Sequence, residues 1–410
     1  LVTDVVHATA SLTMLKSSLE PNSWIDPPNP LADPTDRPHM IAMKNGLLDL
    51  GLLILGEKID DCLQPLTPNW FSFVRLPYGI DAQARCPEWE AFLEKSMEGD
   101  VDRINRLQEW AGYLLTPDNS FQKFLALEGE GRNGKSVYLA GVTAMLGCEN
   151  VSNIKLEDLG ERFQVAGTMG KLANICADTN EVDVRCEGFL KAFTAGDRIH
   201  VDLKYGDGVD FVPSARLMLA WNNRPRFSDK TDAIWRRILM VVWKYQVTDA
   251  EVKIGMDSTG YWERSGELPG MFKWALDGLI RLREAKKFTH SDACENVVSE
   301  FRDEANPARS FLKMFTEAKP GSETTSAGRI PTDRLYHFYC LWCKSQGNRF
   351  PLGAEFFGKE VLRLYPKIKK TRPWTSGDPE GKRPRCFEGI DFSCDEICGE
   401  KTGRDSLSGF

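Results

Sequence analysis

The segment 129–136 constrains the fold of this chain more than any other feature. It reads Gly-Glu-Gly-Arg-Asn-Gly-Lys-Ser and lies between a short apolar run, 124–127, and a longer helix-like run, 137–145. Its glycines allow turns that point backbone N–H groups inward, and a helix starting after the last glycine adds the positive end of its dipole. The spacing G-x-x-x-x-G-K-[ST] between a strand and a helix is typical of a loop that binds nucleotide phosphates. We expect contacts to ATP from Gly129, Glu130, Gly131, Arg132, Asn133, Gly134, Lys135 and Ser136.

Within this loop, Lys135 is expected to reach the outer phosphates and Ser136 to bind Mg²⁺.

The surrounding sequence predicts an α/β fold with a mostly parallel sheet covered by helices. Strand-like apolar runs alternate with helical stretches, at residues 124–127, 172–177, 216–220 and 238–243. A chain of 410 residues exceeds what one hydrophobic core usually supports, so we expect two or three domains.

The flanking segments carry other patterns. Prolines concentrated in residues 20–38 predict an irregular loop, and Asn45-Gly46 between short apolar runs predicts small strands or a hairpin. A polar stretch at 319–328 predicts a linker. Helical spacing of apolar residues recurs in five segments: 89–115 with a break at Gly99-Asp100, 268–287, 291–315, 335–343 and 356–364.

An acidic strand end supplies a second requirement of nucleotide hydrolysis. Asp178 directly follows the apolar run 172–177, and Glu181 lies three residues further on. One carboxylate is expected to hold Mg²⁺ while the other acts as general base. Spacing alone does not divide these roles, and two solvated loop carboxylates are the alternative.

Two further pieces follow or precede later strand-like runs. Asn222, in Asn222-Asn223-Arg224-Pro225, follows the run 216–221, where its amide can orient the attacking water and sense the γ-phosphate. Arg236 and Arg237 come just before the run 238–243. Alone, each piece is weak evidence, because Asn-x-x-Pro is common in turns and arginine pairs are common on solvated surfaces.

The order of these parts resembles the superfamily 3 helicases of the AAA+ class, specifically the helicase region of phage and plasmid primase-helicases and their poxvirus relatives. The likeness covers roughly residues 40–392 and includes 43–49, 86–89, 107–109, 191–197, Trp342-Cys343 and 387–390. It implies an N-terminal irregular or mixed region (1–84), a helical collar (85–118), an AAA+ motor (119–245), a helical segment (246–318), a winged-helix-like DNA-binding domain (329–395) and a tail (396–410).

The resemblance also implies a function. It predicts a homo-oligomeric ring, a hexamer, that uses ATP and Mg²⁺ to translocate on single-stranded or forked DNA in phage or plasmid replication, in the cytoplasm of a bacterial host. Asn222 would be the sensor, and Arg237, or else Arg236, would reach the nucleotide of a neighbouring subunit. The acidic strand end Asp178-Thr179-Asn180-Glu181 departs from the adjacent acidic pair common in such motors, so the identity of the catalytic base stays open. A primase, linked or separate, is an implied partner; the alternative function is an ATPase that closes on DNA at an origin without unwinding it.

Two regions are candidates for DNA contact. Alternating apolar and polar residues on either side of Gly206-Asp207-Gly208 predict a hairpin, and the family projects a hairpin at this position into the ring channel. His200, Lys204 and Tyr205 are therefore expected to contact DNA, with a solvated edge hairpin as the alternative. Residues 359–385 contain nine basic and three acidic side chains. The residues predicted to bind DNA there are Lys367, Lys369, Lys370 and Arg372. The alternative is that these side chains form an ordinary solvated surface.

Composition excludes several classes of protein. A net charge of −7 means that DNA binding must come from local basic patches. The longest apolar stretch, 47–55, is too short to span a membrane, and the start, Leu1-Val2-Thr3-Asp4, carries no signal peptide and indicates a piece of something longer. Eleven scattered cysteines predict reduced thiols, and Cys340 and Cys343 fit an apolar helix better than a zinc site.

Overall fold

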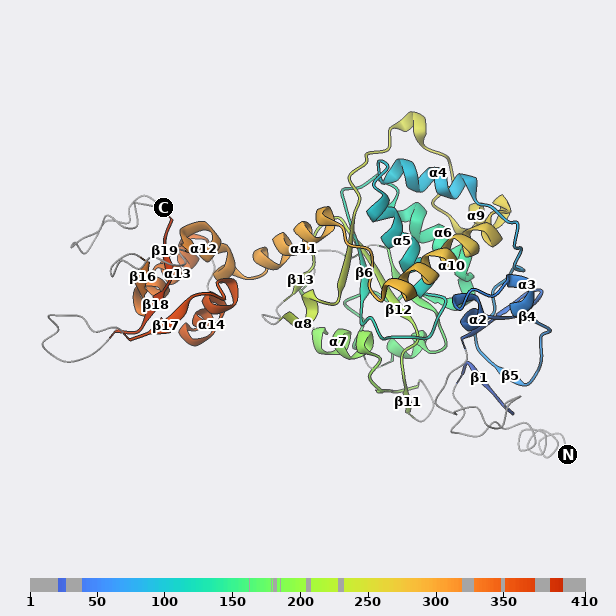
Figure 1. Cartoon of the computed structure of the whole chain (residues 1–410), viewed down its shortest axis with the longest axis horizontal. Coiled ribbons are helices and arrows are strands. Elements are labelled where there is room, and N and C mark those ends of the chain that lie inside the picture. The colour runs from blue at the N-terminus through green and yellow to red at the C-terminus, as the bar shows by residue number, and fades with distance from the viewer. Residues whose placement is uncertain are drawn as a thin grey trace, which may run out of the picture. The chain divides into compact units, whose positions relative to one another are not determined.

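The computed structural model describes residues 21–26, 39–161, 163–177, 179, 183–184, 186–203, 208–227, 232–318, 328–347, 351–372 and 384–393. The chain divides into two compact units, residues 1–298 and 299–410, each with its own hydrophobic core (Figure 1). The boundary falls inside helix α11 (Asp292–Glu304). The finer division into six segments stays a prediction.

Unit 1, residues 1–298, is built on a five-stranded parallel sheet, which confirms the α/β fold predicted from the sequence. The strand order is β14-β6-β12-β8-β7, and every neighbouring pair is parallel. The strands are β6 (Phe124–Glu128), β7 (Val151–Ser152), β8 (Ala173–Cys176), β12 (Arg216–Trp221) and β14 (Ile238–Val242). Because β12 and β14 flank β6, the loop after β6 opens beside the end of β12.

Helices cover this sheet, and two glycines let the longest of them pack closely. Figure 1 shows α5 (Val101–Tyr113), α6 (Lys135–Leu146) and α10 (Leu268–Ala285) gathered beside the strands. A side chain at Gly112 of α5 would overlap the carbonyl of Ala275, and one at Gly278 of α10 would overlap the carbonyl of Gln108. Small residues at both positions therefore permit the close approach of α5 and α10.

Buried arginines from α5 cover the outer edge of β14. Arg103 donates to the carbonyl of Val242 at 2.9 Å, and Arg106 donates to the carbonyl of Met240 at 3.0 Å. These bonds satisfy carbonyl groups that an edge strand leaves without a strand partner. The β14 edge of the sheet is thus fixed to α5.

Helix α4 (Pro87–Ser96) precedes α5, and the residues between them, 97–100, include Gly99-Asp100, where the sequence predicts a break. Pro87 occupies its first turn, and the carboxylate of Glu267 accepts from the backbone N–H groups of Glu88 and Trp89 at 2.9 and 3.0 Å. The remaining helices of unit 1 are α2 (Leu50–Ile54), α3 (Ile59–Cys62), α7 (Glu187–Ala195), α8 (Asp232–Trp235) and α9 (Thr259–Ser265), with short 3₁₀ turns at Cys148–Asn150, Val165–Thr168 and Asp249–Glu251.

Small antiparallel sheets complete unit 1. The hairpin predicted near Asn45-Gly46 is confirmed, with β2 (Met40–Met43) paired to β3 (Gly46–Asp49) and β3 to β4 (Leu63–Gln64). The other short strands are β1 (Ser23–Trp24), β5 (Trp70–Phe71), β9 (Asp183–Val184), β10 (Ile199–Val201), β11 (Val209–Phe211) and β13 (Arg226–Phe227). Among the described residues, no helix is long and apolar enough to cross a bilayer.

Unit 2, residues 299–410, has the winged-helix-like order that the resemblance implies. Helices α12 (Pro307–Phe315), α13 (Thr332–Ser345) and α14 (Ala354–Leu364) pack on a three-stranded antiparallel sheet ordered β16-β18-β17. Its strands are β16 (Arg329–Pro331), β17 (Lys369–Thr371) and β18 (Cys386–Glu388), and β15 (Thr316–Ala318) pairs with β19 (Ile390–Phe392). The helix predicted over 291–315 is two helices, because Asn306 caps α12 and Pro307 opens it.

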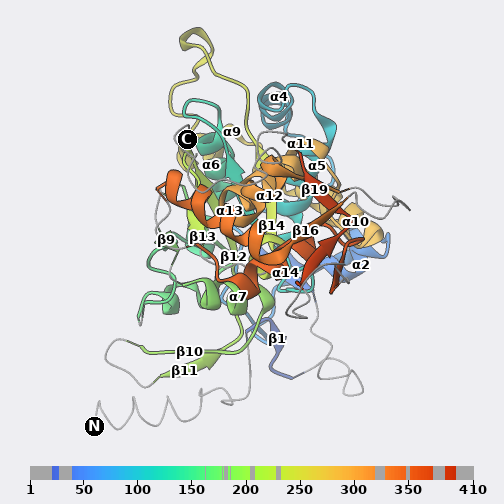
Figure 2. The ribbon, with the colours of Figure 1, turned by 90° about the vertical axis from the view of Figure 1, so that its left-hand side faces the viewer.

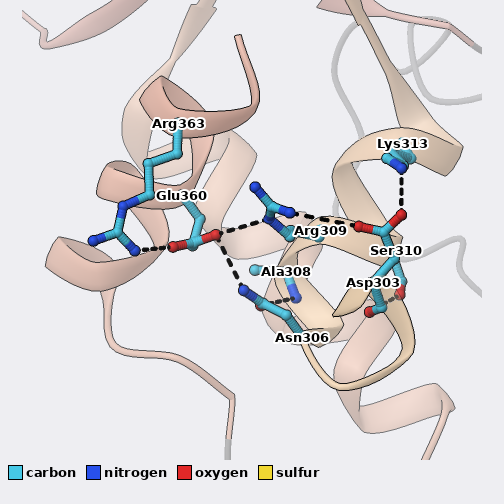
Figure 3. A network of polar contacts seen from close by, with 8 residues as sticks. All are labelled: Asp303, Asn306, Ala308, Arg309, Ser310, Lys313, Glu360 and Arg363. Atoms are coloured by element: carbon cyan, nitrogen blue, oxygen red, sulfur yellow. Dashed lines mark hydrogen bonds and ion pairs between the residues drawn. The ribbon is translucent and has the colours of Figure 1, made fainter. Parts of the chain in front are cut away.

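A polar network lies buried between α12 and α14 in unit 2 (Figure 3). The carboxylate of Glu360 accepts from Asn306 at 3.1 Å, from Arg309 at 3.2 Å and from Arg363 at 2.5 Å. Glu360 is 3% exposed, and Arg309 lies 3.8 Å from a second carboxylate, Asp303. Hydrogen bonds from several donors make the burial of this carboxylate tolerable.

Candidate nucleotide-binding site

The loop 129–134 joins β6 to α6 in the strand–loop–helix order predicted from the sequence. Its last residue, Gly134, has φ of 98°, a left-handed conformation that favours glycine, and α6 begins at Lys135. A side chain at Gly129 would overlap the carbonyl of Trp243, whereas Gly131 faces open space. The loop is therefore tight at its start and accessible at its middle.

Lys135 is held in the loop by oxygen atoms. Its ammonium group donates to the carbonyl of Gly129, to the carbonyl of Glu130 at 3.3 Å and to Oδ1 of Asn133 at 3.3 Å. The residue is 7% exposed, and burial lowers its pKa to about 8, with the nearby Glu128 carboxylate opposing part of that shift. A phosphate group entering the loop would replace these neutral acceptors with negative charge.

Asn222 meets Lys135 across two neighbouring strands. It follows β12, which pairs in parallel with β6, and its Oδ1 lies 3.0 Å from the Lys135 ammonium nitrogen. The carboxyl ends of adjacent parallel strands thus bring together two predicted site residues that are 87 positions apart. Ser136, next along α6, is exposed at the same place.

An ion pair that the sequence reasoning missed lies beside them. Glu128, the last residue of β6, accepts from Nε and Nη2 of Arg224 at 3.0 and 2.7 Å, and from Nε1 of Trp221 at 3.0 Å. The pair is largely shielded, with side chains 14% and 21% exposed. Its signal in the sequence is an acidic residue at the last position of the strand before the loop and a basic one two residues after Asn222.

A cavity of about 1040 Å³ opens over the loop. Residues 131–137 form its floor together with Ala177 and Asn222, and its walls come from α4 and from residues 245–257. Nucleotide-sized ligands occupy cavities of this order. Neither wall was predicted to take part in the site.

The predicted acidic strand end follows β8 in the sequence. Asp178 and Glu181 lie outside the described residues. Ala177, directly before Asp178, lines the cavity, and β8, which precedes both, pairs with β12.

The two predicted arginines have different surroundings. Arg237 is 7% exposed, and its guanidinium donates to Oγ1 of Thr194 at 3.1 Å and to the carbonyl of Ala233 at 2.7 Å. Arg236 is exposed. The first preference of the sequence reasoning, Arg237, is thus engaged by hydrogen bonds within its own chain.

The candidate DNA-binding hairpin is present where it was predicted. Figure 2 shows β10 and β11 running side by side away from α7. His200 on β10 pairs with Asp210 on β11 at 2.7 Å, and both side chains are exposed. Lys204 and Tyr205 lie outside the described residues.

The basic residues predicted to bind DNA in unit 2 are exposed but do not form one uniform face. Lys369 and Lys370 are neighbours in β17, so their side chains point to opposite faces of the sheet. Lys369 lies opposite Glu388, which pairs with Arg329 at 2.7 Å, while Lys370 lies over the ring of Phe387. Lys367 and Arg372, at either side of the strand, are both exposed.

Comparisons with known proteins give one matching family and viral relatives of the chain. Residues 127–237 match the family of unknown function DUF5906. The chain is 23% identical over 288 residues to "Putative helicase L207/L206" of Acanthamoeba polyphaga mimivirus, covering 63% of this chain and 28% of that protein. It is 22% identical over 334 residues to "Putative helicase 121R" of Invertebrate iridescent virus 3, covering 75% and 35%.

Among solved structures, the C-terminal region of NrS-1 matches with a TM-score of 0.48 and 11% identity, covering 80% of this chain and 82% of that one. A second structure of this region gives 0.45 and 12%, covering 85% and 92%. The chain spans about a third of the length of the two viral relatives. The resemblance drawn from the sequence is confirmed at this level: the chain is related to viral proteins of the helicase type.

Proposed function

We propose that this chain is an ATP-driven DNA helicase motor of the superfamily 3 type that works as a homo-oligomeric ring, a hexamer. The observation that carries the proposal is the contact of 3.0 Å between the Lys135 ammonium group and Asn222, at the ends of adjacent parallel strands and beside a cavity of about 1040 Å³. Lysine and a polar amide at these positions can hold a triphosphate and orient the water that attacks it. The similarity to viral putative helicases supports DNA as the polymer on which the motor acts.

The residues at the loop suit a triphosphate. Lys135 would exchange its bonds to the loop carbonyls for bonds to the outer phosphates, and the exposed middle of the loop would offer backbone N–H groups. Mg²⁺ bound with the nucleotide would neutralise charge that develops on the phosphates. Ser136 would hold it together with Asp178, and either Asp178 or Glu181 would serve as general base.

The ring requirement comes from an arginine. We assign the role of reaching a neighbouring subunit's nucleotide to Arg236, because it is exposed whereas Arg237 is buried against α7. Such a residue can raise the rate of phosphoryl transfer by about 10³ to 10⁵.

Contacts to DNA would come from both units. His200, Lys204 and Tyr205 of the β10–β11 hairpin would follow a single strand, and Lys367, Lys369, Lys370 and Arg372 would contact the phosphates of the fork. Basic side chains near an aromatic residue suit binding to single-stranded DNA without sequence preference. The setting would be phage or plasmid replication in a bacterial host's cytoplasm, with a primase as a linked or separate partner.

A strand-displacement assay on forked DNA tests the proposal. The chain should displace the strand with ATP and Mg²⁺, fail with a non-hydrolysable analogue, and fail when Lys135 is replaced by alanine. Equal binding to the fork with either nucleotide and no displacement would instead indicate an ATPase that closes on DNA at an origin without unwinding it. Absence of ATP binding would refute both readings.

A further inference from the structure

The cavity over the loop has an apolar side that phosphates do not need. Its walls beyond the loop are α4 and residues 245–257, which we call the strap. The apolar side chains that these walls contribute to the cavity are Ala91, Phe92, Val247, Val252, Ile254 and Met256. A ligand with its phosphates at the loop can therefore place an apolar group against these side chains.

Phe92 stands directly beside the phosphate-binding loop. A Cβ atom added to Gly134 would lie 3.0 Å from Cε2 of Phe92, so the missing side chain at Gly134 leaves room for this ring. Trp89 also packs against Phe92, with ring centroids 5.6 Å apart. The ring of Phe92 thus packs on Trp89 and lies next to Gly134, the residue before Lys135.

Charged groups tie the strap to α4. Lys253 pairs with Glu88 at 2.6 Å, and Glu251 pairs with Lys95 at 2.7 Å. The hydroxyl of Tyr245 also donates to Glu251, at 2.5 Å. These bonds join five polar side chains of the two walls to one another.

Two apolar side chains of the strap line the cavity and are also exposed to solvent. Ile254 is 94% exposed and Val252 is 50% exposed, although both line the cavity. Figure 1 shows this segment, in yellow, standing out beyond α4. An apolar ring lying between α4 and the strap would cover surface that is otherwise left in water.

The geometry points to a slot for the nucleobase of the bound triphosphate, with Phe92 as one wall and Val252 and Ile254 of the strap as the other. This inference rests on the proposed nucleotide site, since the base enters the slot only when its phosphates lie at Lys135. The walls recognise the flat face of the base by packing. Phe92 and Ile254 would then contribute to affinity for the nucleoside part and not for the phosphates.

Calorimetric titration of the whole chain with ATP and, separately, with inorganic tripolyphosphate tests the slot. Phe92→Ala should weaken ATP binding by about tenfold or more, because stacking on an aromatic ring contributes on this scale. Ile254→Ser should weaken ATP binding by about threefold while leaving stability unchanged, since the side chain is 94% exposed. Neither change should alter tripolyphosphate binding.

The controls separate the slot from the phosphate site. Phe356→Ala removes a phenyl ring that is 61% exposed in unit 2 and should change neither ligand's affinity. Lys135→Ala should weaken both ligands, and if it weakens neither, the proposed nucleotide site is wrong whatever the slot variants do. Unchanged ATP affinity in both Phe92→Ala and Ile254→Ser, or an equal loss for ATP and tripolyphosphate in both, would overturn the slot.

Discussion

Replacing Glu360 by glutamine tests how the buried network of unit 2 holds α12 and α14 together. The substitution preserves the shape of the side chain and removes its negative charge, leaving Arg309 buried with Asp303 3.8 Å away as the remaining nearby carboxylate in the network (Figure 3). Breaking a buried pair from one side typically costs about 3 to 5 kcal/mol. Asp303 offsets part of this cost, and Arg363, whose side chain is 44% exposed, adds little.

We therefore expect a loss of about 2 to 3 kcal/mol in the free energy of opening unit 2. Hydrogen exchange followed by mass spectrometry reads this locally, as exchange about 30- to 150-fold faster at amides of α12 and α14. Glu355→Gln on the same helix is the matched control. Its carboxylate pairs with Lys359 at 2.8 Å, but the two side chains are 79% and 55% exposed, so the change should be within about 0.5 kcal/mol. If both variants exchange at the same rate, burial is not what makes the Glu360 network stabilising.

Three further predictions concern unit 1. Lys135 has a pKa of about 8 in the free protein, and a bound triphosphate favours its ammonium form, so binding takes up a proton above that pH. The ATP affinity measured by calorimetry should therefore fall by up to about tenfold per pH unit above pH 8. A flat profile to about pH 9.5 would contradict this. Arg236→Ala should stop ATP hydrolysis while leaving nucleotide binding and the melting temperature unchanged. Arg237→Ala should lower the melting temperature, because it removes buried hydrogen bonds to α7 and to Ala233. The opposite pattern in hydrolysis and calorimetric melting would reverse the assignment. Gly278→Ala should destabilise the chain by about 1 to 3 kcal/mol in urea unfolding, because the new methyl group overlaps α5. The control is Gly188→Ala on α7, where an added Cβ has no neighbour within 4 Å, so the change should be neutral or stabilising by up to about 1 kcal/mol. Similar results for the two variants would contradict the close packing of α5 and α10.

The sequence predicted the centre of the site because its signals are local. The loop 129–136 and Asn222 each follow an apolar strand, and parallel pairing of β6 with β12 brings them together without further information. The same reasoning located β10 and β11 and the helices of unit 2.

What the sequence did not reveal depends on contacts between distant segments. The pair Lys253–Glu88 joins residues 165 positions apart, so the second wall of the cavity has no local signature. Arg237 is buried against Thr194 of α7, which lies 43 positions away in the sequence. The sequence alone therefore does not distinguish this buried arginine from its exposed neighbour. The sequence contains a signal for the break before Pro307, because Asn306 is a helix cap and a proline follows it. The apolar periodicity continues on both sides of this break and therefore predicted a single helix.

The most direct test of the account is a mixing experiment, because it asks whether ATP is hydrolysed between two copies of the chain. The Lys135→Ala variant keeps Arg236 but has an inactive nucleotide-binding loop. The Arg236→Ala variant keeps an active loop but lacks the arginine. Each variant alone should be inactive, and an equal mixture should recover about a quarter of the wild-type rate per subunit, the share of randomly formed seams with both halves intact. No recovery from a mixture that has been shown to co-assemble, or full activity of Arg236→Ala alone, would contradict the account.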